Sequence, residues 1–126
     1  MEKINLLAGW IGVYLGFITG AFIGLFFHNE NWLGGYTSWP RRMIRLGHIS
    51  FFGLALINFE FVFTVSYLRL EHFLHISSIL FILGAVTMPL CCFLSAFKKS
   101  LKILFLIPVT CLLLAVSAVI YLGFFR

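Results

Sequence analysis

Apolar residues run through most of the chain in four long stretches, and polar residues gather in the segments between them. The stretches cover about 5–27, 39–68, 72–97 and 103–124. One helical crossing of a bilayer takes roughly 20 mainly apolar residues, so each stretch is long enough to cross once. Because most of the connections are short, consecutive helices must run antiparallel. The pattern predicts an all-α protein: a four-helix transmembrane bundle of up-down topology.

The second stretch is longer than a bilayer requires. It begins at Trp39-Pro40 after Ser38, and proline is tolerated in a first helical turn behind a serine cap. About 30 residues at 1.5 Å each give a helix of roughly 45 Å, against about 30 Å of hydrocarbon. We therefore expect the start of this helix, with its arginines, to project beyond the hydrocarbon.

Composition supports the membrane class. The chain has 126 residues, of which 62% are hydrophobic and 10% charged, whereas soluble domains are about a quarter charged. Four spans use most of the chain, so residues 1–126 are expected to form a single transmembrane domain. The net charge of +5 comes from bases that flank apolar spans, which is a mark of membrane topology. We therefore expect the lipid bilayer, and no nucleic acid, as a partner.

The basic residues are unevenly distributed between the two ends of the predicted bundle. Six of the nine lie in or beside the first and third connections: Arg41, Arg42, Arg45, Lys98, Lys99 and Lys102. The positive-inside rule places those connections in the cytoplasm and both termini on the other side. This asymmetry, with a first apolar run too long for a cleavable signal peptide, favours a bacterial plasma (inner) membrane.

A glycine stripe follows one side of the first predicted helix. Gly12, Gly16, Gly20 and Gly24 stand at intervals of four, and His28 is the next step of the series. Glycine lets another helix approach closely, so we interpret the stripe as a packing surface for another membrane-protein subunit or a second copy of the chain. A groove without side chains, ending in a histidine, is also a candidate site for a flat cofactor.

The second predicted helix offers a matching set of ligands. His48, Phe52 and two arginines share one face, and His28 leaves the first helix at the same end. Two histidines on adjacent helices can ligate haem b, with arginines to neutralise the propionates and an aromatic ring beside the porphyrin. The hypothesis assigns these roles to His28, His48, Arg41, Arg42, Arg45 and Phe52. The alternative is that both histidines are solvated or bonded to a loop.

Metal binding is a less favoured hypothesis. Thiolate, thioether and imidazole ligands suit Cu(I), so His28 or His48 with Met88, Cys91 and Cys92 is a conceivable copper site. The spacing matches no specific motif, and cysteines in apolar helices also serve as small packing residues. His72 and His75 form a second candidate pair without a third ligand, and interfacial anchoring explains them equally well.

Glu60 is the most costly residue to place in a bilayer. It lies inside an apolar helix, so we expect it to face the bundle and to be paired or protonated. Such a carboxyl group is a candidate for proton relay or for hydrogen bonding to a quinone. Asn58, on another side of the helix, is the second polar candidate. A carboxyl bonded to a neighbouring helix is the structural alternative.

The chain has no Walker loop, nucleophile elbow or metal-protease motif, and we do not expect an enzyme on its own. The leading hypothesis is a small subunit of a respiratory-type electron-transfer complex that binds haem b between the first two helices. The second is a non-catalytic accessory or assembly subunit that packs against a larger membrane complex. The third is a small protein that handles metal ions or protons.

Overall fold

A computed structural model describes residues 2–70 and 74–125. Its long helices are α1 (Glu2–Gly24), α2 (Trp39–Leu68), α3 (His75–Phe97) and α4 (Leu106–Phe124). Two 3₁₀ helices, η1 (Trp32–Gly34) and η2 (Lys99–Phe105), lie before α2 and before α4. The described residues contain no strand, so the all-α prediction is confirmed. Four helices, the last counted together with η2, are long and apolar enough to cross a membrane.

The helix bounds follow the prediction, with differences at the ends. The bounds of α2 are as expected, with the Ser38 hydroxyl accepting from the Arg41 amide. The first helix ends at Gly24 instead of Phe27 and continues as separate turns. The predicted start of the third helix at residue 72 lies outside the described residues. In the fourth, the 3₁₀ segment η2 comes first, and α-helix begins only at Leu106.

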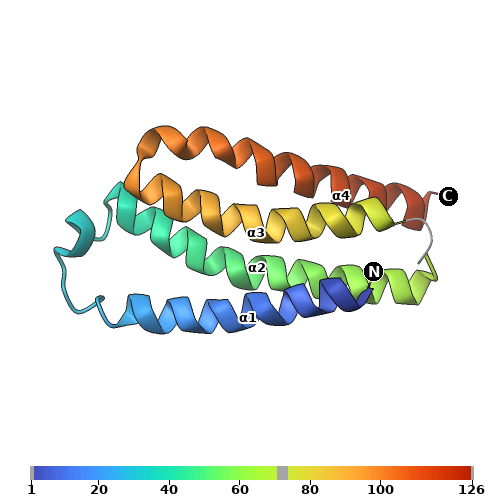
Figure 1. The fold of residues 1–126 in the computed structure, drawn as a ribbon, viewed down its shortest axis with the longest axis horizontal. Coiled ribbons are helices and arrows are strands. Elements are labelled where there is room, and N and C mark those ends of the chain that lie inside the picture. The colour runs from blue at the N-terminus through green and yellow to red at the C-terminus, as the bar shows by residue number, and fades with distance from the viewer. Residues whose placement is uncertain (1, 71–73, 126) are drawn as a thin grey trace.

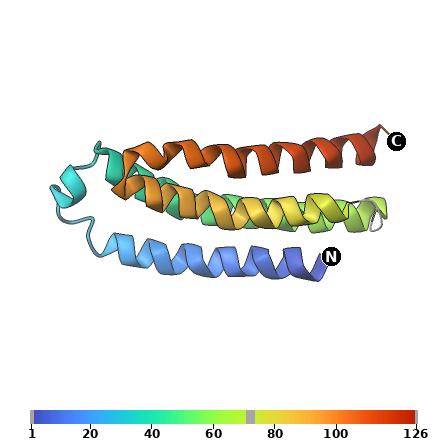
Figure 2. The same ribbon diagram turned by 45° about the horizontal axis from the view of Figure 1, so that its top comes forward.

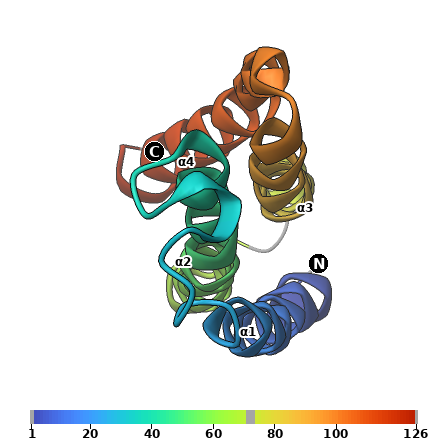
Figure 3. The same cartoon turned by 90° about the vertical axis from the view of Figure 1, so that its left-hand side faces the viewer.

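Consecutive helices are antiparallel neighbours, as predicted. Figure 1 shows both termini at one end of the molecule, together with the end of α2 and the start of α3, while loop 1 (residues 25–38) and η2 lie at the other end. In Figure 2 the α2–α3 pair occupies the centre, with α1 on one side and α4 on the other. The end view in Figure 3 shows the same order. Helix α1 packs mainly on α2, and α4 mainly on α3.

This order leaves much of the molecule's apolar surface uncovered. The accessible surface is 8,095 Å², compared with about 6,800 Å² for a compact soluble protein of 14.4 kDa. Large apolar side chains on all four long helices point outward, among them Phe17, Phe63, Val86 and Leu113. Exposed apolar faces of this extent are typical of helices surrounded by lipid or by another apolar protein.

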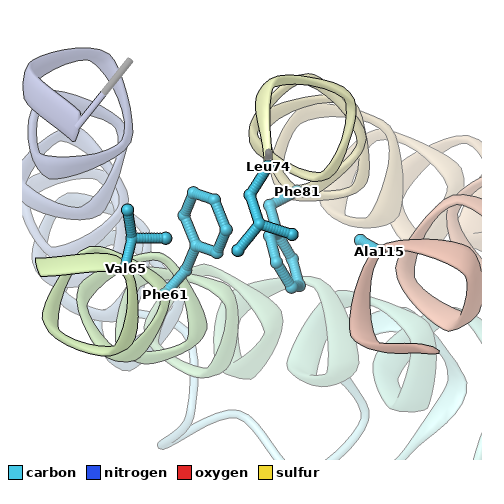
Figure 4. Close-up of a cluster of buried hydrophobic side chains, with 5 residues drawn as sticks. All are labelled: Phe61, Val65, Leu74, Phe81 and Ala115. Carbon is cyan, nitrogen blue, oxygen red and sulfur yellow. The ribbon is translucent and has the colours of Figure 1, made fainter. Parts of the chain in front are cut away.

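The apolar core lies where α2, α3 and α4 meet, toward the end that carries the termini. Figure 4 shows Phe61 and Val65 from α2, Leu74 and Phe81 beside or on α3, and Ala115 from α4. The rings of Phe61 and Phe81 pack with centroids 5.0 Å apart. This contact fixes the two central helices relative to one another, and Ala115 allows α4 to approach them.

Candidate functional site

The glycine stripe of α1 packs against α2 of the same chain. A β-carbon built on Gly9 would meet the Phe59 ring, and one on Gly16 would meet the Phe52 ring. At Gly12 it would lie 3.1 Å from both the Ala55 methyl group and the Phe51 carbonyl oxygen. Only Gly24 of the predicted stripe is open. The close approach inferred from the glycines is therefore present, but α2 already occupies most of the surface predicted for a partner or cofactor.

His48 lies at the end of the α1–α2 contact that is nearer to loop 1. A β-carbon on Gly20 would lie 2.6 Å from the His48 Cε1 atom, so the imidazole sits directly against the α1 backbone. The Thr19 hydroxyl donates to the Leu15 carbonyl at 2.8 Å and lies 3.1 Å from His48 Nδ1. Because a hydroxyl has one hydrogen, we infer that Nδ1 carries the proton and donates to Thr19. His48 thus joins α1 to α2.

The two predicted haem ligands are not brought together. His28 is exposed in loop 1, beyond the end of α1. Since Gly20 is the residue level with His48, eight further residues separate His28 from that level, or roughly 12 Å along a helix axis. Ligation of one iron needs both rings on opposite faces of one porphyrin. The space between the helices is filled by α2 side chains, so the described arrangement does not fit a haem there.

Arg41 and Arg45 have a different setting from that expected of propionate ligands. Arg41 is 4% exposed, and its Nη1 donates to the carbonyl oxygens of Asn29 and Glu30 at 3.4 and 3.1 Å. Its guanidinium lies over three aromatic rings, those of Phe27, Trp32 and Tyr36. The Arg45 guanidinium stacks 3.9 Å above the Tyr36 ring and donates to the backbone carbonyl of Tyr36.

These contacts fold loop 1 around an arginine. Gly34 and Gly35 adopt positive φ values of 85° and 96°, which glycine accepts without strain. The chain can therefore turn back and present its carbonyl groups to Arg41. Arg42, by contrast, is exposed. Of the three predicted propionate ligands, Arg41 and Arg45 therefore contact loop 1, and Arg42 is exposed at the surface.

The copper ligands predicted from the sequence also diverge. Cys91 and Cys92 are buried on α3, but the Cys91 thiol contacts the Leu104 carbonyl at 3.5 Å, while Cys92 packs against Gly47 of α2. Met88 is half-buried on the same helix. Among residues 2–70 and 74–125, no three His, Cys, Asp or Glu side chains converge on a possible metal position. His75 is exposed at the start of α3, and its predicted companion His72 lies outside the described residues.

Three helices meet at a buried polar cluster that the sequence only partly indicated. Asn5 of α1 and Asn58 of α2 are both fully buried, and the Asn5 amide donates to Asn58 Oδ1 at 2.9 Å. It also approaches the Ser78 carbonyl at 3.3 Å, and the Ser78 hydroxyl donates back to Asn5 Oδ1. The Asn58 amide donates to the Leu54 carbonyl. The side-chain oxygen and nitrogen of Asn58 therefore each have a hydrogen-bond partner inside the protein.

Glu60 is exposed, so the expectation that it faces the bundle is wrong. It lies on the rim of a groove between α2 and α4, with Phe61 and Phe81 behind it. No described residue forms an ion pair or a hydrogen bond with its carboxylate. The reason is the helical phase: Asn58 and Phe61 face the interior, and Glu60 falls between them on the outer side.

Thr64 stands one turn beyond Glu60 and lines the same groove. Thr19, Thr87 and Thr110 each donate to a carbonyl in the preceding turn of their own helix. The Thr64 hydroxyl makes no such bond within the described chain. Glu60 and Thr64 therefore present two unengaged polar groups on an otherwise apolar surface.

Comparisons with protein-family models, with curated proteins and with solved structures find no match to this chain.

Proposed function

We propose that the chain is an integral membrane protein that serves as a non-catalytic accessory subunit and packs against a larger membrane protein. The observation that supports this proposal most directly is the exposed carboxylate of Glu60 on an apolar helix. An ionised carboxylate facing lipid costs several kcal/mol, and a protonated one still leaves its hydrogen-bonding groups unsatisfied. A neighbouring protein that covers Glu60 removes this cost.

The remaining polar groups support a structural role. His48, Asn58 and Arg41 hold α1, α2 and loop 1 together. Two further grooves, of about 330 and 310 Å³, lie beside α1 and have almost wholly apolar walls. Catalytic sites combine an apolar pocket with a few convergent polar groups, and these grooves offer no such convergence.

Haem b stays a prediction from the sequence, and no observed geometry favours it over the accessory role. A reduced-minus-oxidised absorption spectrum of the purified protein tests it directly. Sharp bands in the cytochrome b region, lost in His48→Ala, would establish haem binding and replace the present proposal.

The accessory role is tested by the size of the protein after mild detergent extraction from its native membrane. We expect it to migrate on native gels as part of an assembly that contains a second polypeptide in fixed ratio. Glu60→Leu should release the chain, whereas Glu30→Leu, which removes an exposed carboxylate in loop 1, should not. Migration of the wild-type chain alone, or only as multiples of itself, would contradict the proposal.

A further inference from the structure

The groove that contains Glu60 is a shallow apolar surface with two polar side chains. It has a volume of about 160 Å³ and is open along one side of the molecule. Phe61 and Phe81 form its floor, and its outer lining residues come from α2 and α4: Ile57, Glu60, Thr64, Val116, Val119 and Ile120. All but two of these side chains are apolar, so the carboxyl and hydroxyl groups are the distinguishing features of the surface.

The depth of Glu60 restricts what can neutralise it. It stands eight residues before the end of α2 at Leu68, or about 12 Å along the axis. With the hydrocarbon core taken to end at Leu68, this position is close to the middle of its thickness of about 30 Å. The nearest base on its own helix segment is Arg69, roughly 14 Å away along the axis. The other described bases all lie near helix ends or in loops: Lys3, Arg41, Arg42, Arg45, Lys98, Lys99 and Lys102.

The same distribution argues against a second copy as the occupant. A copy inserted in the same orientation would bring its own Glu60 to this depth and none of its bases. In a symmetric contact through this groove, two carboxylates would then face one another at low dielectric constant, where like charges repel strongly. A helix of a different protein that carries a basic side chain at this depth would neutralise the Glu60 carboxylate.

We propose that the groove between α2 and α4 binds one transmembrane helix of another protein, which carries a lysine or arginine at the depth of Glu60. The basic group donates to the Glu60 carboxylate and to the Thr64 hydroxyl, and the apolar part of its side chain packs between Ile57 and Ile120. This inference rests on the proposed accessory function and names the chemistry of its partner. Charge complementarity across a desolvated contact makes the pairing selective.

A synthetic helix tests this chemistry without the native partner. The full chain, with a fluorescent donor at its C-terminus, is reconstituted in phosphatidylcholine vesicles. Acceptor-labelled helices of roughly 20 leucines and alanines, with either one central lysine or none, are added. We expect the lysine helix to bind roughly tenfold more tightly, the scale of an interhelical polar contact in a membrane. The Glu60→Gln and Glu60→Leu variants should reduce or abolish this preference, and Glu30→Leu should keep it.

The alternative outcomes are distinct. Equal binding of the two helices would overturn the basic partner, even if native gels show a second polypeptide and so uphold the accessory function. Energy transfer between labelled copies of the chain that disappears in Glu60→Leu would identify a second copy as the occupant and also overturn it. Glu60→Gln is nearly isosteric, so we expect it to fold like the wild type. Its helix content, measured by circular dichroism, shows whether a lost preference for the lysine helix reflects unfolding.

Discussion

At the scale of single residues, the buried polar side chains hold helices together, whereas the carboxylate of Glu60 faces outward from α2. The Asn5 and Asn58 amides and the Ser78 hydroxyl satisfy one another where three helices meet. Within hydrocarbon an unpaired amide cannot form hydrogen bonds to water, so such a cluster fixes the relative position of the helices. Glu60, which lies only two residues from Asn58, receives no such partner within the described chain.

The Asn5–Asn58 contact should contribute measurably to stability. Asn58→Ala removes the acceptor of the Asn5 amide and should lower the free energy of unfolding by about 1–3 kcal/mol. In a double-mutant cycle with Asn5→Ala, the coupling energy should be about 1 kcal/mol. Unfolding of the purified protein by sodium dodecyl sulfate in mixed micelles measures both values. Ser66→Ala, at an exposed position of α2, should change stability by less than about 0.5 kcal/mol. A coupling energy of zero would show that the contact is not formed.

The sequence indicated only some members of this cluster, for a physical reason. Asn58 stands out because polar residues are rare in the middle of an apolar helix. Asn5 and Ser78 lie near helix starts, where polar residues are ordinary, so nothing in the pattern connects them. The sequence marks Glu60 as costly but does not show which side it faces, since every face of α2 carries apolar residues.

At the scale of helices, the glycines of α1 determine how closely α2 can approach. The spacing of four was sufficient to predict a close packing face. It did not identify the partner helix, because a stripe of glycines fits any apolar helix. The side chains of Phe52, Phe59 and His48 fill the groove, and this explains why they share one face of α2.

Replacement of Gly12 by alanine should separate the two helices. The new methyl group would lie 3.1 Å from the Phe51 carbonyl oxygen and from the Ala55 β-carbon. Since neither is the end of a flexible side chain, overpacking should cost about 1–3 kcal/mol. Gly24→Ala is the matched control, because its methyl group would meet nothing within 4 Å. The same micelle titration compares them, and equal stability of the two variants would argue against the α1–α2 contact.

The ends of the elements were harder to predict than the elements themselves. Ser38 and Pro40 placed the start of α2 correctly because capping is a local interaction. The hydrophobic pattern predicts neither the early end of α1 nor the 3₁₀ segment before α4. In the second case the apolar run from Ile103 is continuous, and hydrophobicity does not distinguish 3₁₀ from α-helix.

At the scale of the whole molecule, the helices form an open series in which α1 and α4 flank a central pair (Figure 2). The sequence predicted antiparallel neighbours from the short connections, and the structure confirms them. It could not predict which outer faces stay uncovered, because apolar residues that face lipid and those that face protein look alike in a sequence.

The orientation in the membrane is a separate prediction. Arg42, Lys98, Lys99 and Lys102 are exposed at the end that carries loop 1 and η2, so this end should be cytoplasmic and both termini should lie on the other side. Reporter tags at the two termini and a protease-cleavable tag inserted after Thr37 measure this in sealed vesicles of known orientation. Cleavage of the loop tag and a terminal tag from the same side would contradict the topology.

Photo-cross-linking in the native membrane tests the central claim, that another protein covers the groove beside Glu60, most directly. A photoreactive amino acid is placed at Ile57 or Ile120, which line the groove, and at Tyr14, which points outward from α1. We predict a discrete adduct with one other polypeptide from both groove positions and none from Tyr14. Adducts with lipid alone at all three positions would contradict the account.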